Sequence, residues 1–284
     1  MLFKLLPCIA REVFCKSNFE RTPEPEMLME DFHSTSAYDF EGKDGVLLGV
    51  YYYQIIQMCG LIKIGDTVVD LGCGSCNLLC ILAELNPDSE FIGVDLSDEM
   101  LELARKNIKE KNIKNIKLIK QDITNIKEID NNSIDVVISS MAIHHLPTKE
   151  MLTSLFAEIQ RILKQEKRVY LYDFGKTKRT ETINFLLNTV TNEFVREDYR
   201  NSLMAAFTLQ DFKNLSKQYL GGSIQVFSTL FVPVIIIIKS ATHPLTIEQK
   251  QKLSLKIKRL NHQQSNDFKM LKLFLLMSGM RSLL

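Results

Sequence analysis

Residues 68–78 read VVDLGCGSCNL, and this stretch decides the fold. Its apolar first half predicts a strand that carries Asp70 near its end, and its second half begins a predicted helix. Gly72 and Gly74 lie in the turn between strand and helix, where glycine allows unusual backbone angles and leaves room for a ligand. The free amides at the start of the helix point to the same place. The stretch therefore predicts a loop that holds a nucleotide-like ligand.

Short β-branched runs alternate with helical patterns downstream of this turn, which indicates a parallel sheet of βαβ units. The expected strands are Thr67–Leu71, Glu90–Asp95, Ile116–Lys120, Ile134–Ser140 and Arg168–Asp173, followed by an apolar strand pair within 223–238. The expected helices between them are 76–85, 97–112 and 149–164. We predict an α/β fold with a Rossmann-like, doubly wound seven-stranded sheet and helical additions at both ends.

The chain divides by pattern into a core and two flanking helical parts. The strand and helix alternation covers 61–240, which we expect to form one domain. A helical cap is expected over 1–60 and a helical extension over 241–284. Residues 180–204 have the pattern of one amphipathic helix with no strand behind it, so the surrounding segment 176–207 is the expected lid.

Composition and charge limit the classes of partner. The chain has 284 residues, 45% apolar and 24% charged, and its 35 basic and 34 acidic residues leave a net charge of +1. This balance removes the usual argument for a nucleic-acid surface. The most apolar run, 226–238, is too short to span a membrane. Six cysteines without regular spacing are not a disulfide framework, and we therefore expect reduced thiols and a cytoplasmic location.

The residues around the glycine turn distinguish between nucleotide-like ligands. Asn77 stands where a dinucleotide fingerprint needs its third glycine, and no Gly-Lys-Ser/Thr follows the turn. Asp70 would repel a pyrophosphate and attract an ammonium group. Asp95, at the end of the next expected strand, can accept both hydrogen bonds of a ribose diol. A ligand with a ribose, an ammonium group and no phosphate is S-adenosylmethionine.

These features resemble the class I S-adenosylmethionine-dependent methyltransferases. Four motifs carry the resemblance: the turn DLGCG, the strand end GVDL, the segment KQDIT, and DVVISSMAIHHLP. The resemblance implies S-adenosylmethionine as cofactor and a set of residues that contact it. That set is Tyr38, Asp70, Gly72, Cys73, Gly74, Asp95, Leu96, Met100, Asp122, Ile123 and Ser139.

Within that family, the HHLP ending and the segment GVDLSDEML look like small-molecule methyltransferases, including those of quinone biosynthesis. The Asn/Asp-Pro-Pro-Tyr motif of DNA amino-methylating enzymes is absent. The resemblance thus implies methyl transfer to a small apolar or aromatic acceptor, with no nucleic-acid partner and no membrane insertion, and it allows a homodimer. Two alternatives stay open: a cyclase or isomerase that binds S-adenosylmethionine without transferring its methyl group, and a catalytically silent binding subunit.

The best candidates for a general base are His144 and His145, because they follow a strand whose carboxyl end faces the expected cofactor. The alternative is that one of them only orients the loop. Asp173, at the end of the fifth strand, could contact substrate or cap its loop. The cysteines of the C-x2-C-x3-C pattern at 73–80 lack a second ligand pair, so we expect no metal. Arsenic methylation is disfavoured because no cysteine follows Cys80.

Overall fold

The computed structural model describes residues 2–25, 32–188, 190 and 193–284, and structural statements below concern these residues. They form one seven-stranded sheet, as predicted, and its strand order is β3-β2-β1-β4-β5-β7-β6. The first five strands run parallel, while β7 is antiparallel to both β5 and β6. The strands are β1 (Thr67–Leu71), β2 (Glu90–Asp95), β3 (Ile116–Lys120), β4 (Ile134–Ser140), β5 (Leu163–Phe174), β6 (Gln225–Ser228) and β7 (Ile235–Lys239).

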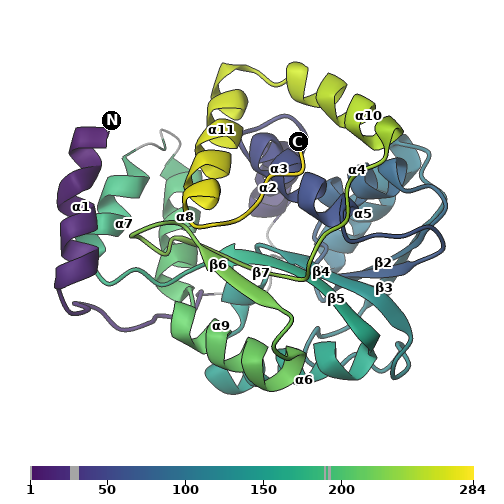
Figure 1. Cartoon of the computed structure of the whole chain (residues 1–284), viewed down its shortest axis with the longest axis horizontal. Helices are drawn as coiled ribbons and strands as arrows, with labels where there is room; N and C mark the ends of the chain where they lie inside the picture. Colours follow the sequence, from purple (N-terminus) through teal and green to yellow (C-terminus); the bar gives the residue numbers. More distant parts are fainter. Residues whose placement is uncertain (1, 26–31, 189, 191–192) are drawn as a thin grey trace.

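Helices cover both faces of the sheet, which makes it doubly wound (Figure 1). The helices are α1 (Leu2–Phe14), α2 (Phe32–Lys43), α3 (Leu47–Cys59), α4 (Asn77–Leu85), α5 (Asp98–Glu110), α6 (Lys149–Ile162), α7 (Thr180–Leu187), α8 (Glu193–Ala205), α9 (Leu209–Leu215), α10 (Ile247–Lys258) and α11 (His262–Met277). The short turns η1 (Ile143–His145) and η2 (Ser216–Leu220) complete the chain. In Figure 1, α6 and α9 lie below the sheet, and α3, α4, α10 and α11 lie above it.

Two hydrophobic cores hold these layers together. The central residues Val68 and Val136 face the helices of the upper layer, whereas their neighbours Val69 and Val137 face α6 and α9. All four side chains are fully buried. This alternation along each strand explains why β1 and β4 read as continuous apolar runs, since both faces of a doubly wound parallel sheet are covered.

Local signals in the sequence set the starts of several helices. The side chain of Ser97 accepts a hydrogen bond from the Met100 amide at the start of α5, and Thr148 does the same for α6. The C-terminal additions also form helices, as predicted, and α11 packs along α3. No helix among the described residues is both long and apolar enough to cross a membrane.

Two element boundaries differ from the sequence prediction. The helix expected over 180–204 is two helices, α7 and α8, and residues 189, 191 and 192 between them lie outside the described residues. The helix expected to reach 164 ends at Ile162 instead. Leu163 already pairs with Ile134 of β4, and Lys167 takes a positive φ of 37°, so the fifth strand begins earlier and is irregular.

The turn between β1 and α4 depends on a glycine at position 72. Gly72 has φ +77°, and a Cβ added there would lie 2.3 Å from the Cβ of Ala142. Gly65 has a similar φ of +81° but nothing within 4 Å of its added Cβ. A substitution at Gly65 therefore measures the energetic cost of the backbone angle alone. A substitution at Gly72 measures that cost together with the cost of the clash with Ala142, in the loop after β4.

We expect Gly65→Ala to lower the free energy of unfolding by about 1–2 kcal/mol, the cost of a left-handed alanine. Gly72→Ala should lose a further 1–3 kcal/mol, roughly, because the Ala142 methyl must also move. Urea denaturation of both variants measures the difference. Equal losses would show that the contact with Ala142 is easily relieved.

Candidate functional site

The glycine turn is held in place by the carboxylate of Asp95, at the end of β2. Its Oδ2 accepts a hydrogen bond from the Gly74 amide at 2.8 Å, and its Oδ1 accepts one from the Ser97 amide at 3.0 Å. Gly74 itself has φ +51°. The turn lies at the carboxyl ends of β1 and β4, where the strand order reverses and open α/β sheets bind their ligands.

Asp70 is a buried carboxylate that lacks a partner for its charge. Only 4% of the residue is exposed, and its Oδ1 atom has no hydrogen-bond partner among the described residues. Burial, together with the nearby charge of Asp95, raises the pKa of Asp70 to about 8. An uncompensated buried carboxylate beside a ribose-binding candidate fits the ammonium group of S-adenosylmethionine, and it does not fit a phosphate.

A pocket opens directly in front of this turn. Nine of the residues predicted from the sequence line it: Tyr38, Gly72, Gly74, Asp95, Leu96, Met100, Asp122, Ile123 and His145. Five further lining residues were not predicted: Ser97, Met141, Ala142, Leu146 and Met151. Met141, Ala142 and Leu146 lie within the motif DVVISSMAIHHLP, Ser97 directly follows GVDL, and Met151 lies four residues beyond Pro147, so the available signal for them was position in or next to a motif.

Four of the predicted residues are not among the residues that line the pocket. Asp70 lies behind the turn, and Cys73 is buried with its Sγ 2.9 Å from where a Cβ of Gly93 would lie. The hydroxyl of Ser139 donates to the Leu71 carbonyl at 2.7 Å and so ties β4 to β1. The fourth residue, His144, is described below. Contact of these residues with the cofactor stays a prediction.

Tyr38, an implied cofactor contact, and its neighbour Asp39 have separate roles. Tyr38 lines the pocket, and its hydroxyl lies 3.3 Å from that of Tyr51. The carboxylate of Asp39 points into a buried polar network, where it accepts hydrogen bonds from Asn77 at 2.9 Å and Asn107 at 2.7 Å. Asn77, the residue that breaks the dinucleotide fingerprint, thus anchors the N-terminal helix α2 to α4.

His144 is completely enclosed at the end of β4. Its Nδ1 lies 2.7 Å from Oδ1 of Asp173, and the other oxygen of Asp173 accepts the Ile143 amide at 2.7 Å. Burial opposes protonation of His144, but Asp173 and Glu24 outweigh it and raise its pKa. Asp173, for which the sequence left a substrate contact or a capping role open, orients His144 and caps the η1 turn.

His145 faces the pocket, stacked at 4.4 Å between ring centroids on His144. Burial, followed by the neighbouring His144, lowers the pKa of His145 to about 3. The imidazole is therefore neutral at pH 7 and can accept a hydrogen bond, but it binds a proton only weakly. This environment suits orientation of a group better than strong proton abstraction.

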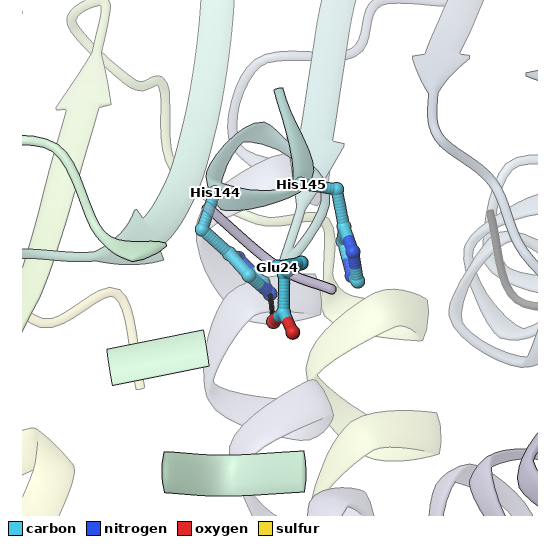
Figure 2. A group of neighbouring side chains, drawn as sticks. All are labelled: Glu24, His144 and His145. Atoms are coloured by element: carbon cyan, nitrogen blue, oxygen red, sulfur yellow. Dashed lines mark ion pairs between the residues drawn. The ribbon is translucent and has the colours of Figure 1, made fainter. Parts of the chain in front are cut away.

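An extended N-terminal segment, residues 17–25, brings two residues to this site that the sequence reasoning missed. The guanidinium of Arg21 donates to the carbonyls of Leu146 at 2.5 Å, Pro147 at 2.6 Å and Ala205 at 2.6 Å. Three residues on, Glu24 is 6% exposed and lies 3.9 Å from His144 Nε2. Figure 2 shows the Glu24 carboxylate between the two imidazoles, which both project from the η1 turn. The available signal was Glu24's place between two prolines, a stiff extended pattern.

Helices α7 and α8, which make up most of the predicted lid 176–207, pack on the body of the domain. Ile183, Leu187 and Leu203 of α7 and α8 pack into a small core with Phe174. Among the described residues, the ones that line the pocket include none from 176–207. In this structure the apolar stripe docks the two helices on the body, and a lid motion stays a prediction.

Comparisons with known proteins agree with the fold and the turn. A family model described as a methyltransferase domain matches residues 62–198. The plantazolicin methyltransferase BpumL, solved in complex with SAH, aligns over 81% of this chain and 86% of its own with a TM-score of 0.56 and 18% identity. A SAM-dependent methyltransferase from Aquifex aeolicus aligns over 74% of this chain and 97% of its own, with a TM-score of 0.54 and 17% identity. At these identities the structures show the fold alone.

The domain is thus a Rossmann-like methyltransferase domain of class I architecture. Residues 62–198 form this methyltransferase domain, and S-adenosylmethionine is its cofactor.

Three curated relatives cover the chain in part. An arsenite methyltransferase of Halobacterium salinarum is 34% identical over 115 residues, which is 40% of this chain and only 28% of that protein. A demethylmenaquinone methyltransferase of Lactobacillus johnsonii is 33% identical over 110 residues, 38% of this chain and 43% of the relative. A tRNA (guanine-N(7)-)-methyltransferase of Clostridium botulinum is 27% identical over 168 residues, 54% of this chain and 74% of the relative. These matches leave the acceptor open.

If Asp95 anchors the cofactor's ribose, Asp95→Ala should weaken S-adenosylmethionine binding tenfold or more. The reason is that each lost hydrogen bond to a charged group costs about 1.5–3 kcal/mol of binding free energy. Asp98→Ala is the matched control, because this exposed carboxylate three residues later pairs only with Lys120. Titration calorimetry measures both affinities, and a melting curve checks that the glycine turn still folds. Unchanged affinity in a folded Asp95→Ala variant would refute the assignment.

If Asp70 pairs with the ammonium group, cofactor affinity should rise between pH 6 and 7.5. Below its pKa of about 8 the carboxyl is protonated in the free protein, so binding must first release a proton. The dependence can reach about tenfold per pH unit. Above that range the cofactor's own amino group titrates, at about 7.7–8.0.

Asp70→Asn should bind weakly with no such pH dependence, yet unfold at a higher temperature at pH 9. A raised pKa means that ionisation destabilises the fold, and this cost is fully present above the folded pKa. Methylthioadenosine, which lacks the ammonium group, serves as the control ligand. The assignment fails if its binding follows the same pH profile.

Proposed function

We propose that this protein transfers the methyl group of S-adenosylmethionine to a small apolar or aromatic acceptor. The observation that carries the proposal is the composition of the part of the pocket that the implied cofactor contacts do not form. There Met141, Ala142, Leu146 and Met151 give an apolar wall, and His145 supplies a polar group. An apolar cavity with a few convergent polar groups is the usual form of a small-molecule site.

The chain's own residues contribute mainly by alignment. S-adenosylmethionine supplies an electrophilic methyl group on a sulfonium, which leaves as a neutral thioether when the acceptor attacks. Asp70 and Asp95 would fix the two ends of the cofactor, and the apolar wall would exclude water from the reacting atoms. Correct alignment can supply about 7–11 kcal/mol of the barrier. His145 would accept a hydrogen bond from the acceptor and hold its nucleophilic atom toward the methyl group, and His144 would support it.

The wall of the pocket favours a quinone-like or aromatic acceptor over arsenite. All six cysteines lie within the described residues, and five of them are buried while Cys15 is exposed. None of them is among the pocket-lining residues. A thiol cluster facing the cofactor is what a thiophilic arsenic acceptor would need. The near-zero net charge likewise favours a small molecule over tRNA.

The two other functions considered from the sequence share the cofactor site and differ in product. A cyclase or isomerase would bind S-adenosylmethionine without producing its demethylated form, and a silent subunit would bind it weakly. The open pocket beside intact Asp70, Gly72, Gly74 and Asp95 favours an enzyme. A cytoplasmic location and a homodimer stay predictions.

The test is incubation of the protein with methyl-deuterated S-adenosylmethionine and a metabolite extract, followed by mass spectrometry. We expect one or more small apolar or aromatic products heavier by a CD3 group, with stoichiometric loss of cofactor methyl. Separate incubations contain bulk tRNA and arsenite. The Asp95→Ala variant, weak in cofactor binding, provides the background. Label in tRNA or arsenic alone, or cofactor binding without any labelled product, would overturn the proposal.

A further inference from the structure

We propose that Glu24, His144 and His145 bind a divalent transition-metal ion of the zinc type, next to the cofactor pocket. One ligand atom from each of the three lies within 4.8 Å of the others. Two imidazoles and one carboxylate form a ligand set that zinc uses in sites with an open fourth position. The expectation of no metal considered the cysteines only, and Glu24 lies 120 residues upstream of His144.

When His144 is neutral, no hydrogen bond joins it to Glu24. His144 Nε2 and Glu24 Oε1 are 3.9 Å apart, which is too long for a hydrogen bond. The Nδ1 atom of the same ring lies 2.7 Å from Asp173 Oδ1. Because a carboxylate accepts, Nδ1 carries the proton in the neutral ring, and the lone pair of Nε2 is directed at Glu24. Two acceptor atoms thus face each other in a buried space.

A metal ion between these atoms would resolve that arrangement. Ligand atoms on a tetrahedral zinc ion, with bonds of about 2.0–2.1 Å, lie roughly 3.3–3.4 Å apart. The observed 3.9 Å between His144 and Glu24 therefore requires a contraction of about half an ångström, and the other pairs, all within 4.8 Å, require at most about 1.5 Å. The rings of His144 and His145 are 4.4 Å apart and inclined by 34°, so both can present a nitrogen to one point. The Nδ1 atom of His145 is also buried without a partner among the described residues.

Neighbouring side chains form hydrogen bonds that orient two of the three ligands, His144 and Glu24, as is usual around metal sites. Asp173 fixes the tautomer and the orientation of His144, the carboxylate–histidine–metal arrangement. The Ser202 hydroxyl donates to Glu24 Oε1 at 2.8 Å and so holds the oxygen that faces His144, which keeps a second lone pair for the ion. Arg21 fastens the segment that carries Glu24 through backbone carbonyls, so its positive charge is bound elsewhere.

The position of the ion gives it a role. His145 belongs both to the cluster and to the pocket wall, so the open coordination position would face the acceptor side. An ion there could bind an acceptor oxygen and favour its deprotonated form. This role rests on the proposed methyl transfer, whereas the binding of the ion does not.

Metal binding is tested on the full-length protein after treatment with a chelator and dialysis, in the absence of cofactor. Titration with ZnCl2 in a calorimeter should show one equivalent bound. CoCl2 should give visible absorption bands typical of nitrogen and oxygen ligands in a low-symmetry site. Glu24→Gln, which keeps the size and the hydrogen bond from Ser202, should weaken binding tenfold or more. His145→Asn should weaken it and alter the cobalt spectrum.

Glu20→Gln is the matched control, since this exposed carboxylate lies on the same segment outside the cluster. It should bind zinc and cobalt as the unaltered protein does. Melting curves establish that each variant is folded. Absence of a zinc equivalent in the unaltered protein would overturn the proposal, and so would unchanged affinity in folded Glu24→Gln. Cofactor binding by the metal-free protein is measured separately, so failure of the metal site and failure of the proposed function are distinguishable.

Discussion

The site depends on the carboxylate of Asp95, because this group at the end of β2 binds the glycine turn that follows β1. By accepting the Gly74 amide it fixes a left-handed turn that few sequences can adopt. That turn in turn sets where α4 begins and leaves the space in front of β1 open. Burial raises the pKa of Asp95, and the backbone amides of Ser97, Gly74 and Leu96 oppose this by favouring its charged form.

The same arrangement places a second carboxylate, Asp70, where none of the described residues compensates its charge. Polar contacts away from the pocket stabilise the fold and offset the cost of burying Asp70. At the opposite ends of the strands Arg168 holds Asp66 through two hydrogen bonds, of 2.5 and 2.9 Å. The polar network around Asn77 and Asn107 secures the helices over the turn. The fold therefore concentrates its unfavourable electrostatics at the place where a cationic ligand would relieve them.

The sequence was sufficient for the sheet and for the cofactor half of the pocket because both depend on local patterns. Strands such as β1 and β4 are continuous apolar runs, and the glycine turn has its own spacing. Strand ends that depend on pairing with a neighbouring strand were harder to predict from the sequence. For example, β5 begins earlier than expected because Leu163 pairs with Ile134 of β4. Ser139 and Cys73 carry family motifs, yet their contacts in this structure are with the backbone and the neighbouring strand.

The other half of the site was hidden for a similar reason. Met151 and Leu146 reach the pocket only through the packing of α6 and η1. Glu24 comes to lie beside His144 and His145 through a segment with no periodicity of its own. No local pattern in residues 17–25 states which distant carbonyls Arg21 will bind. Such contacts between distant parts of the chain appear only when the whole tertiary structure is known.

The attachment of residues 17–25 also has a consequence for how the protein matures. Arg21 binds carbonyls that lie 125, 126 and 184 positions further along the chain. Contacts of such long range close late, because the intervening chain must first be ordered. On the ribosome the segment emerges before the carbonyls that Arg21 binds, and its docking surface is incomplete until α8 is made. The cofactor half of the pocket can therefore form first, and the acceptor half closes around it as the last step of folding.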